Sequence, residues 1–181
     1  MLSAVLFTNT GENSITWAQC VESFSKELIL HDVPLYDQKK SSLCWAFCQI
    51  MVEDYFAGRK RTQTEAFQRA VEVAKSVYGD YDWDRVGYPL NRNVRYSVSE
   101  ISFDFLVEKL KEGPLYGYYK DLNSPDRAHY VVITGVDVTN KLVFTNNPWG
   151  KYGVQTYSEF LRQFVGTKNG YPLYSIYDIN Q

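Results

Sequence analysis

Apolar residues recur every three or four positions along several segments of the chain, which is the spacing of one buried face of an α-helix. The first clear case starts at Cys44, carries Trp45 and Tyr55 on its apolar side, and stops at Gly58. The next opens with Thr-Gln-Thr-Glu at residues 62–65, the pattern of a capping box. The pattern predicts helices at about residues 43–56, 62–77, 102–110 and 158–164.

The second half of the chain contains segments rich in Val, Ile and Tyr that are separated by turn residues, which is typical of β-strands. We expect strands at about residues 115–119, 130–136, 142–145 and 174–179. Helices first and strands second indicate an α+β fold, with a mainly antiparallel sheet. Residues 80–96 mix aromatic, charged, Gly and Pro residues without a period, so they are predicted to form a long loop or an irregular hairpin.

The first 30 residues are the least interpretable part of the sequence. Residues 2–8 have the pattern of a short strand, and an apolar stripe of helical spacing begins at Trp17. The apolar run at residues 4–7 has no basic flank and is too short for a secretory signal or a membrane span. Because no linker or internal repeat divides the 181 residues, we expect one domain over residues 1–181.

The balance of charge argues against nucleic acid as a partner. The chain has 19 basic and 21 acidic residues, for a formal net charge of −2. Its longest basic cluster, Arg59-Lys60-Arg61, is too short to follow a phosphate backbone. With 45% hydrophobic residues the chain can bury a sizeable core. We therefore expect a globular monomer that binds neither nucleic acid nor a membrane.

The cysteines and histidines limit the chemistry further. Cys20, Cys44 and Cys48 are odd in number, so they cannot form a complete disulfide framework. Cys44 and Cys48 lie four positions apart on one predicted helix, where disulfide geometry is rare, so we expect thiols. The chain has two histidines, His31 and His129, and no CxxC or HxxxH spacing. We expect no metal site and no other cofactor.

Cys44 is the candidate nucleophile because it opens a predicted helix. The positive end of the helix macrodipole lowers the pKa of a thiol and favours the reactive thiolate. If Cys44 lies at this helix end and beside His129, we expect its pKa to be well below that of a free cysteine. Gln38, six positions earlier, could supply a side-chain N–H to an oxyanion together with the Cys44 backbone N–H. The alternative for Cys44 is a buried core thiol, which is common for cysteine.

His129 and Asn147 supply the remaining groups of a nucleophilic site. His129 stands at the start of an apolar strand, whose packing would hold it rigidly, and we interpret His31 as structural or superficial. Asn147, in Asn-Asn-Pro-Trp-Gly, follows the next strand and could orient the imidazole, with Trp149 shielding the bond from water. Asn146 is a rival for this role, and a plain Asn-Pro turn is the simpler alternative.

Taken together, three motifs resemble the papain-like cysteine peptidase superfamily. They are Gln38 ahead of Cys44-Trp-Ala-Phe, His129 with its apolar strand, and Asn147-Pro-Trp-Gly, in that order within residues 33–150. The compact bacterial branches are the most similar: effector proteases of plant pathogens, staphopain-like enzymes and bacteriocin-processing peptidases. The chain departs from papain in having Ser-Ser-Leu before Cys44, and only 85 residues separate Cys44 from His129, against about 130–150 in papain.

The resemblance implies a papain-like fold, in which a helical half carrying the nucleophile packs on a sheet carrying His129 and Asn147. It also implies a cysteine endopeptidase acting on a protein or peptide, with Cys44, His129, Asn147 and Gln38 as catalytic residues. Two alternatives stay open. The same site could serve another acyl transfer, such as deamidation or transamidation, or the fold could be a non-catalytic binding module.

A biological setting follows as a hypothesis from the same reasoning. The sequence shows no signal peptide and no propeptide of useful length, so an active protease would threaten its producer. We expect a bacterial toxin or effector that is secreted or delivered into a target cell, is neutralised by an inhibitor or immunity protein, and acts in a reducing or thiol-permissive compartment. The alternative is a mature enzyme excised from a longer precursor.

Overall fold

The predictions made above can be compared with the structure over most of the chain. A computed structural model describes residues 28–79, 94–97, 102–120, 128–164, 167–168, 171–172 and 174–178. The expected strand at residues 2–8, Cys20 and most of the expected loop or hairpin at residues 80–96 lie outside the described residues. The expected helical stripe of Trp17, Val21, Phe24 and Leu28 also lies outside them, except for Leu28, which begins a strand and not a helix.

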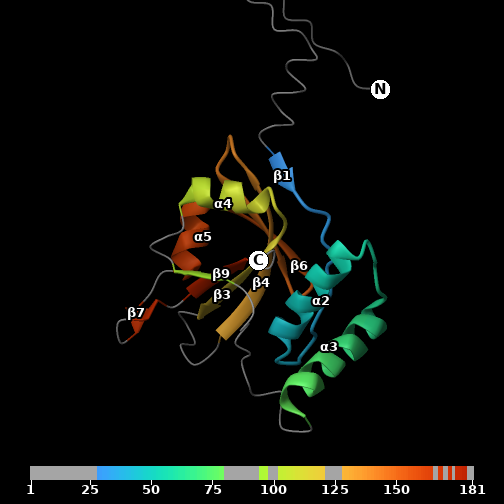
Figure 1. Ribbon diagram of the computed structural model, residues 1–181. Coiled ribbons are helices and arrows are strands. Elements are labelled where there is room, and N and C mark those ends of the chain that lie inside the picture. The colour runs from blue at the N-terminus through green and yellow to red at the C-terminus, as the bar shows by residue number, and fades with distance from the viewer. Residues whose placement is uncertain are drawn as a thin grey trace, which may run out of the picture.

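An antiparallel sheet runs through the middle of the molecule (Figure 1). Its strands lie in the order β2-β9-β3-β4-β5-β6, and β1 pairs with the C-terminal part of β4. Every described strand pair is antiparallel, which confirms the expected kind of sheet. The strands of this sheet are β1 Leu28–Leu30, β2 Val94–Ser97, β3 Leu115–Lys120, β4 Ala128–Asp137, β5 Leu142–Asn147, β6 Lys151–Thr156 and β9 Tyr174–Asp178, and a separate pair consists of β7 Thr167–Lys168 and β8 Tyr171–Pro172.

The helices lie close to their predicted positions, and the order of elements confirms the α+β class. The described helices are α2 Cys44–Phe56, α3 Gln63–Tyr78, α4 Phe103–Leu110 and α5 Tyr157–Phe164. The strands differ from the predictions in several places. Residues 94–96, expected in a long loop or an irregular hairpin, belong to β2, and β5 continues to Asn147, past the expected end. The sequence pattern predicts none of β1, β6, β7 and β8.

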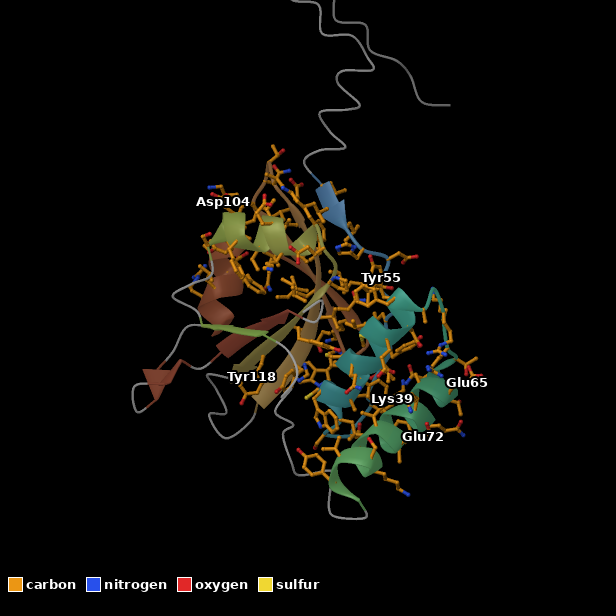
Figure 2. All side chains as sticks on the ribbon, in the orientation of Figure 1. Lys39, Tyr55, Glu65, Glu72, Asp104 and Tyr118 are labelled. Carbon is orange, nitrogen blue, oxygen red and sulfur yellow. The ribbon has the colours of Figure 1, made fainter. Side chains whose placement is uncertain are left out.

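Helices cover both faces of the sheet (Figure 1). On one face α2 and α3 form a core with alternate residues of the central strands, such as Tyr130 and Val132. On the other face α4 and α5 form a second core with the intervening residues, such as Val131 and Ile133. Because neighbouring residues of a strand point to opposite faces, the continuous apolar run in β4 follows directly from burial on both sides. The side chains fill the space on either side of the strands (Figure 2).

α2 is buried between the sheet and α3, which explains why most of its length is apolar. α3 presents a narrow face of small residues to α2, including Ala66 and Ala70, so the two helices can approach closely. Its start is the expected capping box. The Glu65 backbone N–H donates to Thr62 Oγ1 at 3.3 Å, and the Thr62 backbone N–H donates to Glu65 Oε2 at 2.7 Å.

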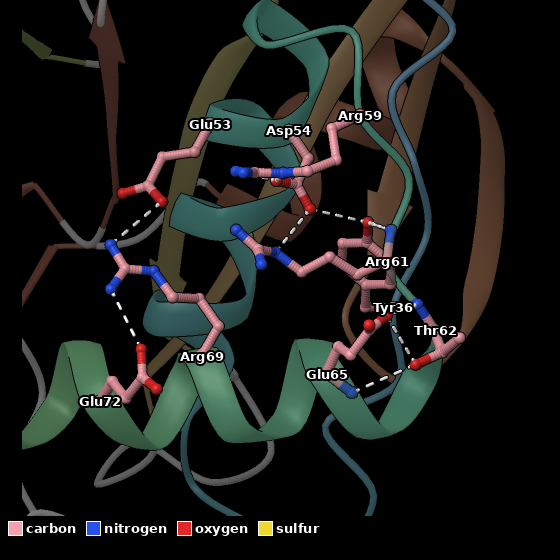
Figure 3. A network of polar contacts seen from close by, with 9 residues as sticks. All are labelled: Tyr36, Glu53, Asp54, Arg59, Arg61, Thr62, Glu65, Arg69 and Glu72. Carbon is pink, nitrogen blue, oxygen red and sulfur yellow. Dashed lines mark hydrogen bonds and ion pairs between the residues drawn. The ribbon is translucent and has the colours of Figure 1, made fainter.

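One buried acid near the end of α2 joins three segments (Figure 3). Asp54 is fully buried; it accepts from Tyr36 Oη at 2.8 Å and forms ion pairs with Arg59 at 2.7 Å and Arg61 at 3.0 Å. Burial raises the pKa of Tyr36 to about 12, so its hydroxyl stays protonated and remains a donor. A buried carboxylate is tolerated only with such partners, so the network ties the segment that precedes α2 to the loop that precedes α3.

No helix among the described residues is both long enough and apolar enough to span a bilayer. Within the same ranges, no group of three or more His, Cys, Asp or Glu residues comes together as a metal site.

Candidate active site

Cys44 is the first residue of α2, as predicted, and its side chain is 7% exposed. The preceding residue, Leu43, is fully buried and provides no side-chain cap, and the first turn contains no acidic residue. The positive end of the helix therefore faces the sulfur without a neutralising carboxylate. The backbone N–H groups of Tyr130, Trp45 and Cys44 lie near the sulfur and lower the pKa of the thiol, with Tyr130 contributing most of the three. Tyr130 directly follows His129 in the chain, so this contact brings the neighbour of the candidate base to the candidate nucleophile.

His129 lies near the start of β4, buried to 6% exposure. Its Nε2 is 3.0 Å from Asn147 Oδ1. Because an amide oxygen can only accept, this bond puts the proton on Nε2 and makes Nδ1 the basic nitrogen. The imidazole also stacks on Trp149, with ring centroids 4.3 Å apart and an interplanar angle of 26°. The indole covers one face of the ring, as the shielding expectation for Trp149 requires.

The structure distinguishes between the two adjacent asparagines. Asn147 Oδ1 accepts both from His129 and from the Trp149 backbone N–H, which is 3.0 Å away. Asn146 is buried, and its Nδ2 donates to the Val33 backbone oxygen at 2.8 Å. Asn147 therefore lies at the histidine, whereas Asn146 anchors the segment that runs towards Gln38.

Gln38 is buried in the loop that leads into α2. Its Nε2 donates to the Ser41 backbone oxygen at 2.7 Å, while its Oε1 is buried and has no hydrogen-bond partner. The bond to Ser41 uses one of the two N–H donors of the amide. The Gln38 backbone N–H donates to the Pro148 oxygen at 2.6 Å, which ties this loop to the turn after Asn147.

A family model described as "Peptidase_C39 like family" matches residues 30–171. The chain belongs to this peptidase family. The match contains all four candidate residues and agrees with membership of the papain-like cysteine peptidase superfamily and with the α+β fold. No curated protein matches the chain significantly.

In this Peptidase C39-like protein the helix end does not by itself give Cys44 the low pKa that was expected. Burial raises the pKa of the thiol, and the three backbone N–H groups offset that increase only in part. Desolvation disfavours the charged thiolate more than the helix end favours it. The helix end alone therefore does not account for a thiolate at Cys44. Tyr130, one of the residues near the sulfur, directly follows His129 in β4.

The other thiol and the other histidine of this region are structural. Cys48 lies one turn further along α2, is fully buried and has a pKa well above that of a free thiol because of its burial. Cys44 and Cys48 are both free thiols, as expected. His31 uses both ring nitrogens, with Nε2 2.7 Å from the Leu110 oxygen and Nδ1 2.8 Å from the hydroxyl of Tyr55. It joins the start of the chain's described part to α2 and α4, as its structural interpretation requires.

Several contacts that shape this site leave no recognisable pattern in the sequence. Ser41 and Pro148 hold Gln38 through backbone oxygens, which no residue pattern reveals. The Tyr130 backbone N–H contacts the Cys44 sulfur through a main-chain group that any residue would supply. Gln63, at the start of α3, contacts the loop from a position 26 residues away from Asp37 in the sequence.

Proposed function

We propose that this Peptidase C39-like protein is a cysteine endopeptidase that uses Cys44 as nucleophile and His129 as general base and acid. The observation that carries the proposal is the connected arrangement of the site. Asn147 holds His129 Nε2 at 3.0 Å, and the adjacent Tyr130 N–H lies near the Cys44 sulfur. A nucleophile, a base and a group that orients the base are the elements that acyl transfer through sulfur needs.

The proposed reaction begins when His129 Nδ1 takes the proton of the Cys44 thiol. The thiolate attacks the scissile carbonyl carbon, a C–S bond forms, and the carbonyl π electrons move to oxygen. The second Nε2–H of Gln38 and the Cys44 backbone N–H would donate to this oxyanion. When the intermediate collapses, the C–N bond breaks and the imidazolium gives its proton to the leaving amine.

Water then completes the reaction on the same residues. His129 removes a proton from water, the hydroxide attacks the thioester carbonyl, and the C–S bond breaks to release the carboxylic acid product and the thiol. Asn147 keeps the imidazole in one orientation through both halves, because its oxygen accepts from Nε2 in the neutral and the protonated ring. Trp149 covers the ring face, which limits competition by solvent for that bond.

A proteome digest tests the proposal. Cell extract is treated with the wild type or with Cys44→Ala, and newly formed amino termini are identified by mass spectrometry. The proposal expects new termini with the wild type alone. Ammonia release with +1 Da glutamine side chains and no new termini would indicate a deamidase instead. A Cys44 thiol that reacts with no acyl substrate would indicate a binding module.

We also propose that the peptidase is a bacterial toxin or effector restrained by a dedicated inhibitor protein. Support comes from the resemblance of the Gln38, Cys44 and Asn147 motifs to compact bacterial effector and processing peptidases, and from a nucleophile that works only as a free thiol in a thiol-permissive compartment. Expression of the wild type in the cytoplasm of a susceptible cell should arrest growth, and Cys44→Ala should not. Equal growth of the two strains would refute this role.

A further inference from the structure

Gln63 holds the backbone of Asp37, the residue that precedes Gln38. Gln63 Oε1 accepts from the Asp37 backbone N–H at 3.0 Å, and Gln63 Nε2 donates to the Asp37 backbone oxygen at 2.5 Å. One side-chain amide thus satisfies both main-chain groups of a single residue, as a neighbouring β-strand would. On another side Asp37 forms a β-bridge with Trp149. The Asp37 backbone therefore lies between the start of α3 and the turn that carries Trp149.

The turn on the Trp149 side is shaped to receive Asp37. Gly150 has a φ of +71°, and a Cβ built at this position would lie 3.1 Å from the Asp37 Cβ. A larger residue would be strained in that backbone conformation and would push the two segments apart. The adjacent Gln38 N–H bond to Pro148, at 2.6 Å, continues the same pairing. Small displacements of Asp37 are therefore passed directly to Gln38.

The start of α3, which carries Gln63, is held in place by hydrogen bonds of its own. The Thr62 capping box closes the first turn, and the Arg61 backbone N–H donates to Tyr36 Oη at 2.8 Å (Figure 3). Tyr36 in turn donates to the buried carboxylate of Asp54. These contacts join α3 to the segment before α2. Gln63 adds a further contact, with Asp37, the residue that precedes Gln38.

We infer that Gln63 is a positioning residue for the oxyanion-binding amide of Gln38. The inference rests on the proposed function, because Gln38 needs accurate placement only if an oxyanion forms at Cys44. Gln63 is exposed and lies on a different element from every candidate catalytic residue. Its two bonds limit the movement of the loop on the α3 side. Without these two bonds the loop can move and Gln38 is held less accurately, whereas the buried core is unchanged because Gln63 is exposed.

A double-mutant cycle tests the inference. The proteins are the wild type, Gln63→Ala, Gln38→Ala and the double variant, with Gln68→Ala as the control because Gln68 is exposed on the same helix and makes neither contact. Gln63→Ala should lower kcat roughly tenfold with little change in KM, since misplacing a catalytic group is costly. When Gln38 is already alanine, Gln63→Ala should lower kcat by less than about twofold, because Gln63 acts only through the Gln38 side-chain amide. Gln68→Ala should match the wild type.

Two further readouts separate positioning from a general structural effect. Alkylation of Cys44 by iodoacetamide forms no oxyanion, so its rate should be the same in Gln63→Ala and the wild type. Hydrogen exchange at the Asp37 amide should become faster in Gln63→Ala, because its acceptor is gone.

Each outcome bears on a different claim. Equal costs of Gln63→Ala in both backgrounds, or unchanged turnover of the single variant, would overturn the inference while leaving the peptidase proposal intact. Slower alkylation in Gln63→Ala would also overturn it, because the effect would then reach the nucleophile and not Gln38 alone. A wild type that turns over no acyl substrate would overturn the proposed function and the inference with it.

Discussion

The dependence of Cys44 on His129 gives the sharpest prediction about the site. Burial raises the pKa of the Cys44 thiol despite three backbone N–H donors, so the helix end cannot by itself produce a thiolate near neutral pH. A protonated imidazole alongside would favour the thiolate and allow the pair to exist as thiolate and imidazolium. Replacing His129 with alanine removes that partner and leaves the buried thiol on its own.

The size of the effect follows from the direction of the shift. A thiol with the ordinary pKa of about 8.5 is roughly 1% thiolate at pH 6.5. Because burial raises the pKa of Cys44 above its ordinary value, His129→Ala should hold less than about 1% thiolate at that pH. If most of the wild type carries the ion pair, alkylation at pH 6.5 should fall about 10²-fold or more in the variant. The difference should shrink as the pH rises through the pKa of the isolated thiol.

The assay is the rate of Cys44 alkylation by iodoacetamide between pH 4 and 10, read by peptide mapping. Cys48 is the internal control, because it is fully buried and its pKa is raised well above the usual value, so it should label slowly in both proteins. The wild type should label Cys44 ahead of Cys48 at mildly acidic pH. Equal rates at Cys44 in the two proteins at pH 6.5 would refute the reasoning, as would a wild-type profile that titrates only above pH 8.5.

Four further substitutions separate catalytic roles from structural ones. Asn147→Ala should lower kcat but leave residual activity and an unchanged melting temperature. Asn146→Ala should lower stability by about 1–3 kcal/mol in urea unfolding, because it leaves the buried backbone oxygen of Val33 without its donor. The reverse pattern would exchange the roles of the two asparagines. Gln38→Ala should cost about 10²–10³ in kcat measured on a peptide substrate, the usual effect of losing one oxyanion donor, and a loss below about threefold would remove Gln38 from the site. Asp54→Ala should destabilise the fold by about 1–3 kcal/mol in urea unfolding, because it leaves the Tyr36 hydroxyl without its acceptor and the mostly buried Arg61 without its carboxylate, and an unchanged midpoint would contradict the network.

Most of the secondary structure was predictable because burial imposes a period on the sequence. α2 is apolar around much of its surface and α3 carries a complete capping box, so both were found close to their true bounds. β6 was missed because it pairs with β5 alone and its sequence, Lys-Tyr-Gly-Val-Gln-Thr, has no buried face to set an alternation. β2 was missed because it lies at the other end of the sheet order, in a segment whose mixed composition predicted a long loop or an irregular hairpin.

The candidate site was predictable in its residues and less so in its energetics. Cys44, His129 and Asn147 stand in recognisable local patterns, and the fold brings Asn147 to His129. The direction of the Cys44 pKa shift was not predictable, because it depends on how much of the chain covers the thiol, and sequence alone does not give that. The Gln63 contact with Asp37 joins residues far apart in the chain and leaves no local pattern.

The central claim is that acyl transfer passes through the sulfur of Cys44, activated by His129. The most direct measurement is intact-protein mass spectrometry during turnover of a peptide ester, followed by peptide mapping of any adduct. The account predicts a hydroxylamine-sensitive acyl adduct on Cys44 in the wild type, no adduct in Cys44→Ala, and almost none in His129→Ala. Turnover that continues in Cys44→Ala, or an acyl group found on another residue, would contradict it.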